Sequence, residues 1–323
     1  MKIRTDKNRF VTASPLSMDT MKDHISVCVA TYHRNQMLEH LLRNVALQET
    51  GGLFDLSVVV VDNDAAGSAR ETVMRLRTEL GADISYDIEP ERSIPAVRNH
   101  ALRLARGNYI GIIDDDEFPP QNWLINMYRA ISKFEVDGAL GPVHPFFDQQ
   151  PPVWLLKSRL CERPVHRTGT LLHWNQTRTG NVLLKKEVFE KHHLSFDVKF
   201  KTGGSDQDFF KQAMQAGCRF IAVEEAPVYE IVPPERWIKS YYLKRALVNG
   251  FNAYRYSMNE KGISSRLMVP LKSTSALLIY ALAVPFCACL GSHVLMNCLV
   301  KGAHHLSRLF AMMGIELVPK RDF

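Results

Sequence analysis

The feature that most constrains the fold of this chain is a short apolar segment that ends in four consecutive acids. Residues 109–113 form a β-type apolar run, and residues 114–117 follow it as Asp-Asp-Asp-Glu. Four adjacent carboxylates repel one another, so a strand end holds them only where a cation or hydrogen-bond donors share the site. Oxygen ligands favour Mg²⁺ or Mn²⁺, and these ions commonly bind substrate phosphates as well. The run predicts a metal site for a diphosphate substrate, with a solvated acidic turn as the alternative.

Composition limits the class of protein and the partners. A chain of 323 residues can form one large α/β domain with an appendage, or two domains. The net charge of +6 permits acidic partners such as phosphates and anionic lipids, but no basic block, zinc-ligand spacing or aromatic RNA-binding motif indicates nucleic acid. Six cysteines without CxxC spacing favour a reduced, cytoplasmic chain. Residues 1–24 contain no apolar signal-peptide core, and we expect a flexible lead-in there.

Strands and helices alternate along the first half of the chain. Apolar runs predict strands at residues 25–30, 56–61, 84–88 and 110–113, and periodicity predicts helices at 36–47, 68–80 and 95–106, with Gly107 as the C-terminal stop of the last. This alternation predicts an α/β fold with a mostly parallel sheet flanked by helices. Ligands of such sheets bind beyond the carboxyl ends of the strands, where the polar clusters 31–34, 62–64 and 114–117 all fall.

Several polar motifs follow one another in a distinctive order and spacing. They are Val-Ala-Thr-Tyr-His-Arg at 29–34, Val-Val-Asp-Asn-Asp at 60–64, Ala-Val-Arg-Asn-His-Ala at 96–101, the acidic run, Thr-Gly-Asn at 179–181 and Gly-Gly-Ser-Asp-Gln-Asp-Phe at 203–209. In these motifs residues 25–255 resemble family 2 glycosyltransferases with the GT-A fold. The stretch at 228–233 and the apolar tail are most similar to bacterial exopolysaccharide transferases of the succinoglycan type.

The resemblance implies a GT-A domain at residues 25–258, with a nucleotide-binding half at 25–120 and an acceptor half at 121–258. The implied donor-site residues are Thr31, Tyr32, Arg34, Asp62, Arg98, Asp114 and Asp115, and the implied ligands of Mn²⁺ or Mg²⁺ are Asp116 and Asp114 of the DXD pattern. Chemistry makes these roles reasonable, because a carboxylate at a strand end can accept from a uracil N–H and an arginine can donate to phosphates. Arg98 is alternatively a solvated helix residue, and Asp115 a turn residue.

The second chemical centre is Asp206, which follows two glycines and precedes a helix expected at 208–216. In the family this position carries the general base, and we expect that role for Asp206, with Asp208 as a cap or a structural residue. Ser205 stands where the family has Glu, which puts that supporting role in doubt. The alternative is that Asp206 is an ordinary helix cap.

Two further positions depart from the family pattern. Glu230 occupies a place where many relatives carry a metal-binding His, and it is either an oxygen ligand or a buried structural residue. Arg236-Trp237 resembles the end of the QxxRW signature of processive synthases, but Pro233 replaces the Gln, which argues against processive synthesis. Residues 142–172 are either a connector over the acceptor site or a surface excursion.

The C-terminal part predicts contact with a membrane. Residues 273–300 contain no Asp, Glu, Lys or Arg, a length that can span a bilayer. A single span would place the basic tail outside, against the positive-inside tendency. We therefore expect a re-entrant or in-plane pair of membrane-associating helices within 259–323, with a buried helix pair as the alternative. The preceding helix, 239–256, is basic and aromatic, which suits a membrane surface, a phosphorylated acceptor or a solvated face.

Taken with the resemblance, these features predict an inverting, metal-dependent transfer from a UDP-sugar to a hydroxyl of a polyprenyl-diphosphate-linked saccharide. The expected location is the cytoplasmic face of the inner membrane. A nucleotidyltransferase is one alternative, although residues 30–35 lack the glycine that its phosphate loop requires. A catalytically inactive membrane scaffold is another, and loss of the DXD pattern or of Asp206 would mark it.

Overall fold

The computed structural model describes residues 22–200, 203–260 and 263–318, without the side chains of 255–260 and 263–267. The first half alternates as expected. Its elements are β1 (Asp23–Thr31), α1 (Asn35–Ala46), β2 (Phe54–Asp62), α2 (Arg70–Leu80), β3 (Ile84–Ile88), α3 (Ile94–Leu104), β4 (Tyr109–Ile113) and β5 (Glu117–Phe118). The second half contains α4 (Trp123–Phe134), β6 (Gly138–Leu140), β7 (Val143–Phe146), α5 (Val153–Ser158), β8 (Asn181–Lys185), α6 (Glu187–Glu190), α7 (Ser205–Gln215), β9 (Phe220–Ala222) and β10 (Val228–Ile231), and two 3₁₀ turns, η1 (Trp174–Gln176) and η2 (Pro234–Arg236).

The main sheet has seven strands in the order β3-β2-β1-β4-β8-β6-β9. All run parallel except β8, which is antiparallel to both of its neighbours. The prediction of a mostly parallel α/β sheet is therefore confirmed. Because β1 and β2 are paired so that Thr31 lies opposite Asp62, their carboxyl ends open at the same edge of the sheet.

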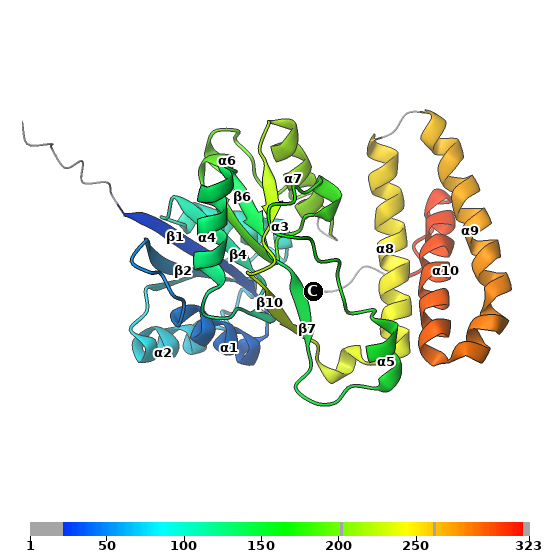
Figure 1. The fold of residues 1–323 in the computed structure, drawn as a ribbon, viewed down its shortest axis with the longest axis horizontal. Helices are drawn as coiled ribbons and strands as arrows, with labels where there is room; N and C mark the ends of the chain where they lie inside the picture. The colour runs from blue at the N-terminus through cyan, green and yellow to red at the C-terminus, as the bar shows by residue number, and fades with distance from the viewer. Residues whose placement is uncertain (1–21, 201–202, 261–262, 319–323) are drawn as a thin grey trace, which may run out of the picture.

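Two apolar layers cover the sheet, one on each face (Figure 1). Helices α1, α2 and α4 pack on one face, where Leu38, Leu41 and Trp123 are fully buried. Helices α3 and α7 pack on the other, where Phe210 contacts Phe220 of β9 and Phe209 contacts Phe210. Strands buried on both faces must be apolar at every position, which explains the continuous valine run in β2.

Two predicted helix boundaries are wrong. α3 ends at Leu104, with Ala105 as its C-cap, so Gly107 does not stop it. Gly107 is needed for close approach instead, because a Cβ there would lie 2.3 Å from the backbone oxygen of His24. α7 begins at Ser205 rather than at residue 208, with Gly204 as its N-cap at φ +100°.

A second sheet of three strands lies beside the edge where the polar clusters meet. Its order is β5-β10-β7, with β10 antiparallel to β5 and parallel to β7. This pairing sets Glu230 directly opposite Glu117, the last residue of the acidic run. Residues 142–172, interpreted from the sequence as a connector or a surface excursion, contain β7 and α5.

Three long helices stand beside the α/β domain (Figure 1): α8 (Lys239–Glu260), α9 (Ile263–Leu290) and α10 (Ser292–Met312). α10 packs against both α8 and α9, and also against α5. One helix of the described chain, at Met268–Leu290, is long and apolar enough to cross a membrane by length and composition. Its residues Leu278, Leu282 and Phe286 are 60%, 74% and 74% exposed. The alternative of a buried helix pair is therefore wrong for α9.

Candidate active site

A cavity of about 470 Å³ lies at the carboxyl edge of the main sheet. Its lining includes six of the seven predicted donor-site residues, the metal candidate and Glu230: Thr31, Tyr32, Arg34, Arg98, Asp114, Asp115, Asp116 and Glu230. They come from the ends of β1, β4 and β10 and from the side of α3. The structure thus brings together residues that lie up to 199 positions apart in the sequence (Thr31 to Glu230).

Arginine side chains neutralise the acidic run. Arg34 donates from Nη1 to Asp115 Oδ1 at 2.8 Å and to Asp116 Oδ2 at 3.1 Å, and Arg236 Nη2 reaches the same Asp116 oxygen at 3.2 Å. Thr31 Oγ1 donates to Asp115 Oδ2 at 2.9 Å. Burial raises the pKa of Asp115 to about 6, and the charge of Arg34 limits that rise.

Arg98 joins the two predicted chemical centres. Its Nη1 lies 2.6 Å from Asp206 Oδ1 and its Nη2 lies 3.2 Å from Asp114 Oδ1. The Arg98 side chain is only 11% exposed. Burial alone would lower its pKa, but the Asp206 and Asp114 carboxylates outweigh burial and raise it. The alternative of a solvated Arg98 is therefore wrong.

Asp206 does not act as a helix cap, since α7 has no side-chain cap bond and its N-cap is Gly204. The second Asp206 oxygen, Oδ2, accepts from Thr179 Oγ1 at 2.8 Å. Burial would raise the pKa of Asp206, but Arg98 and the hydrogen bonds from Thr179 hold it below its ordinary value. Asp208 instead accepts from Gln212, one turn along α7, at 2.7 Å. Ser205 Oγ also donates to Asp206 Oδ1, at 3.3 Å. Asp206 is thus a deprotonated carboxylate held by three side-chain partners.

Asp62 is the predicted donor-site residue that does not line the cavity. It is fully buried, and its Oδ2 accepts from the backbone N–H of Ala69 at 2.8 Å and from Tyr86 Oη at 3.0 Å. Its Oδ1 accepts from the backbone N–H of Asp64. In this structure Asp62 shapes the loop after β2, and its contact with a nucleotide stays a prediction. The cavity is lined here by its neighbour Asn63.

Sequence reasoning missed several residues of the site. Glu117 is buried, and its carboxylate accepts a hydrogen bond from the backbone N–H of Asp114. Burial and the charges of Asp114 and Asp116 raise the pKa of Glu117 well above its ordinary value. Thr179 and Arg236 lie within motifs that are visible in the sequence. Nothing in the local sequence indicates which side chains they contact. Arg92 lies over the ring of Tyr32, 4.6 Å from its centroid.

Glu230 is held by two arginines. Its Oε2 lies 2.5 Å from Arg163 Nη2 and its Oε1 lies 3.0 Å from Arg236 Nη1. Both oxygens are therefore engaged in ion pairs, which fits the structural alternative for this residue.

The acidic residues supply the type of oxygen ligand that divalent ions prefer. Carboxylate oxygens suit Mg²⁺ and Mn²⁺, and both arginine contacts of Asp116 fall on Oδ2, so neither arginine occupies Oδ1. Among the described residues no group of three His, Cys, Asp or Glu side chains could hold a metal by itself. A bound ion would therefore need water or substrate oxygens to complete its shell, as Mg²⁺ commonly does.

Comparison with known proteins decides the family. The sequence model of Glycosyl transferase family 2 matches residues 26–196, more than half of the chain. The chain belongs to glycosyl transferase family 2. The succinoglycan biosynthesis protein ExoM of Rhizobium meliloti is 32% identical to this family 2 chain over 231 residues, which cover 70% of the chain and 73% of ExoM. The chondroitin synthase of Escherichia coli is 26% identical over 66% of the chain and 35% of its own length.

Solved structures share the fold of this family 2 member. The mannosyltransferase PcManGT from Pyrobaculum calidifontis, in complex with GDP-Man and Mn²⁺, aligns with a TM-score of 0.60 at 18% identity, covering 90% of this chain and 88% of its own. Staphylococcus aureus TarS in complex with UDP-GlcNAc aligns with a TM-score of 0.52 at 14% identity, covering 91% and 92%. The predicted GT-A fold and glycosyltransferase class are confirmed, and the nucleotidyltransferase and scaffold alternatives are not supported.

Proposed function

We propose that this glycosyltransferase transfers a sugar, with inversion, from a UDP-sugar to a hydroxyl of a polyprenyl-diphosphate-linked saccharide in exopolysaccharide biosynthesis. The observation that carries the proposal is the position of Arg98, which lines the donor cavity and joins Asp114 of the DXD pattern to Asp206 beside that cavity. The similarity to ExoM, named for succinoglycan biosynthesis, supports the pathway class, and the UDP-GlcNAc in TarS supports the donor class.

The donor occupies the cavity at the sheet edge in this proposal. Tyr32 and Thr31 contact the base and ribose, and Arg34 and Arg98 donate to the nucleotide and its phosphates. Asp115 keeps Arg34 and Thr31 in position through its two hydrogen bonds.

Asp116 and Asp114 would hold Mn²⁺ or Mg²⁺, and the structure of PcManGT in complex with Mn²⁺ supports a divalent ion at this site. When bound, the ion offsets negative charge on the departing nucleoside diphosphate.

Asp206 is the general base. It takes the proton of the acceptor hydroxyl while that oxygen bonds to the anomeric carbon and the bond from this carbon to the diphosphate oxygen breaks on the opposite face. One displacement inverts the anomeric centre. The lowered pKa of Asp206 means that its side chain is deprotonated at neutral pH, and Thr179 and Arg98 fix its orientation.

The same proposal divides the chain into a lead-in at 1–24, a catalytic domain at 25–258 and membrane-associating helices at 259–323. Residues 1–21 of the lead-in lie outside the described residues, and its last two residues, Asp23 and His24, already belong to β1. The exposed apolar face of α9 supports attachment to the membrane, and we place the enzyme on the cytoplasmic face of the inner membrane.

A melting-temperature assay with UDP and Mn²⁺ tests the proposal. We expect UDP to stabilise the protein and Mn²⁺ to increase that shift, because a ligand that binds only the folded state stabilises it. Asp116→Ala should lose the Mn²⁺-dependent part, because the diphosphate charge is then uncompensated. Its neighbour Asp115→Asn is the matched control and should lose less. A wild-type melting temperature indifferent to UDP and to Mn²⁺ would contradict the proposal, and full transfer by Asp116→Ala in EDTA would contradict the metal assignment.

A further inference from the structure

A smaller cavity of about 110 Å³ adjoins the donor cavity. It is lined by Leu160, Cys161, Glu162, Arg163, Arg178, Glu230, Val232, Arg236, Tyr241, Tyr242 and Arg245. Glu230 lines both cavities, so the two adjoin at this side chain. The smaller cavity, which we call the arginine cavity, therefore opens between the catalytic domain and α8.

Four arginines but only two acidic residues, Glu162 and Glu230, line the arginine cavity. Arg163 and Arg236 share Glu230, and Glu162 pairs with Arg159. Arg178 and Arg245 form no ion pair with any residue in the described part of the chain. Desolvation and the nearby guanidinium groups of Arg163 and Arg245 lower the pKa of Arg178. Such mutual repulsion is relieved by a bound anion, and guanidinium groups match the geometry of phosphate oxygens.

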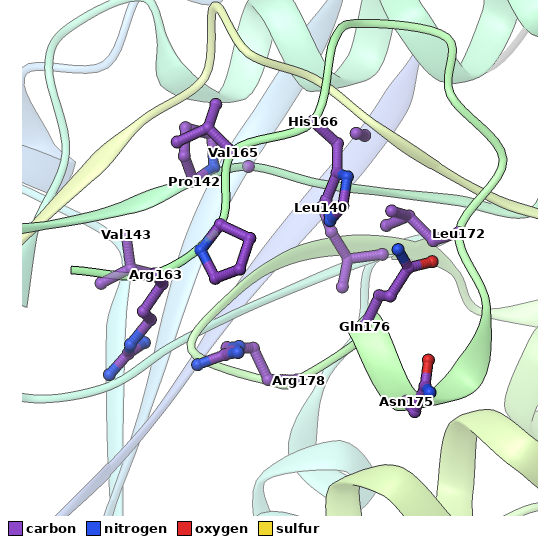
Figure 2. Close-up of a pocket in the computed structure, with 13 residues that line it drawn as sticks. Leu140, Pro142, Val143, Arg163, Val165, His166, Leu172, Asn175, Gln176 and Arg178 are labelled. Carbon is purple, nitrogen blue, oxygen red and sulfur yellow. The ribbon is translucent and has the colours of Figure 1, made fainter. Parts of the chain in front are cut away.

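Next to the arginine cavity lies a third cavity of about 170 Å³, which shares Arg163 and Arg178 with it. Figure 2 shows these two side chains extending toward the same side of that third cavity, away from Asn175 and Gln176. The two guanidinium groups thus stand at the boundary between two hollows, and part of Arg178 is exposed to solvent. A ligand can reach them without moving the fold.

We propose that Arg178 and Arg245, with Arg163, bind the diphosphate group of the lipid-linked acceptor in the arginine cavity. This inference rests on the proposed function. A diphosphate carries more than one negative charge, which matches a set of neighbouring guanidinium groups better than a single charge does. The donor diphosphate belongs elsewhere, because neither Arg178 nor Arg245 lines the cavity that contains Asp114 and Asp116.

The position of the arginine cavity suits an acceptor with a lipid tail. Arg245 belongs to α8, which packs against α10, and α10 packs against α9 with its exposed apolar face. On the other side of the cavity, Thr179, the residue after Arg178, donates to Asp206 at 2.8 Å, so the chain segment that carries Arg178 also holds the proposed base. The lipid, the diphosphate and the reacting hydroxyl can then occupy adjoining parts of one surface.

Calorimetric titration of geranyl diphosphate into the full-length protein, saturated with UDP and Mg²⁺, tests the inference. We expect Arg178→Gln and Arg245→Gln each to weaken geranyl diphosphate binding roughly tenfold or more, because each removes charge-assisted hydrogen bonds to phosphate. The affinity for UDP should stay unchanged in both. Lys244→Gln is the matched control, because Lys244 is exposed on the same helix and does not line the cavity. It should keep the wild-type affinity for geranyl diphosphate.

The other outcomes would overturn either this inference or the proposed function. Unchanged geranyl diphosphate binding in both arginine variants overturns the inference, and so does an equal loss in Lys244→Gln, which would assign the effect to the general charge of α8. A parallel loss of UDP affinity overturns it by assigning the arginines to the donor. Wild-type protein that binds UDP but not geranyl diphosphate overturns this inference alone, whereas wild-type protein that does not bind UDP overturns the proposed function. Arg178→Gln decides the matter even where Arg245→Gln lowers the melting temperature, because Arg178 is exposed.

Discussion

At the scale of single residues, the acidic groups of the site are held in place by arginines. Arg98 holds Asp114 and Asp206, and Arg236 holds Asp116 and Glu230. Partly buried charges lose hydration, and only their close pairing offsets that loss. Removal of one partner therefore leaves an uncompensated charge, so substitutions at the site should preserve shape and polarity wherever a role in catalysis is to be tested.

The residue-scale prediction concerns Asp206. Asp206→Asn keeps the shape of the side chain but removes the proton acceptor, and we expect the transfer rate to fall by about 10² to 10⁴. The UDP dissociation constant should change little, because Asp206 does not line the donor cavity. The melting temperature should fall modestly, since Arg98 keeps its second carboxylate partner, Asp114. Transfer rate, UDP affinity and melting temperature are measured on the same preparation.

Asp208→Asn is the control for that experiment. Asp208 lies two residues after Asp206 in α7 and accepts a hydrogen bond from Gln212. Its substitution should therefore leave the transfer rate nearly normal. Near-normal transfer by Asp206→Asn beside a collapse in Asp208→Asn would show that Asp208 is the base.

At the scale of elements, the segment that leads into β8 packs against the acidic run. Gly180 immediately precedes β8, and a Cβ at this position would lie 2.7 Å from Glu117 Oε1 and 3.2 Å from Asp114 Oδ2. Thr179, one residue earlier, binds Asp206. The short segment before β8 thus sets the distance between the two chemical centres, and it has no room for a larger residue at Gly180.

We expect Gly180→Ala to lower the free energy of unfolding by about 1–3 kcal/mol, because the added methyl group overpacks a buried carboxylate. The transfer rate should fall as well, since Glu117 or Asp114 must move. The control is Gly302→Ala in α10, where the nearest atom to the new Cβ is 3.7 Å away. Alanine at that helical site should stabilise by about 0.5–1 kcal/mol. Denaturant unfolding measures both changes, and equal stability of Gly180→Ala and wild type would contradict the packing argument.

At the scale of the whole molecule, the three C-terminal helices are joined to the catalytic domain through α5. Leu155 of α5, Tyr242 of α8 and Met296 of α10 form a buried cluster. Removal of α10 would expose this cluster, so truncation is a poor test of membrane attachment. Substitutions on the outer face of α9 leave the cluster intact.

We expect Leu282→Glu with Phe286→Glu to reduce sedimentation with vesicles of anionic lipid severalfold, because two charges on an apolar face oppose insertion. Both positions are 74% exposed, so the melting temperature and UDP binding should stay normal. The control is Leu47→Glu with Leu53→Glu, two exposed leucines near α1, which should sediment as wild type does. Undiminished sedimentation of the α9 variant would assign membrane attachment to another surface.

The sequence by itself determined the order of the elements and the edge at which the site forms. Apolar runs and helical periodicity are local properties, so β1, β2, β4 and α1 lie where the pattern predicted them, within a few residues. Parallel strands end at one edge, and the polar clusters that follow these strands therefore line one cavity. The family motifs, which are also local, predicted the GT-A fold that the comparisons confirm.

Only the tertiary structure decided which partners these side chains have. Asp62 turns its oxygens to its own loop, Glu117 lies opposite Glu230, and Arg236 reaches an aspartate 120 positions earlier in the chain. The arginine cavity likewise joins Arg178 and Arg245 from separate elements. A partner far away in the sequence leaves no trace in local composition, because the contact depends on how strands and helices pack, and packing is a property of the folded chain as a whole.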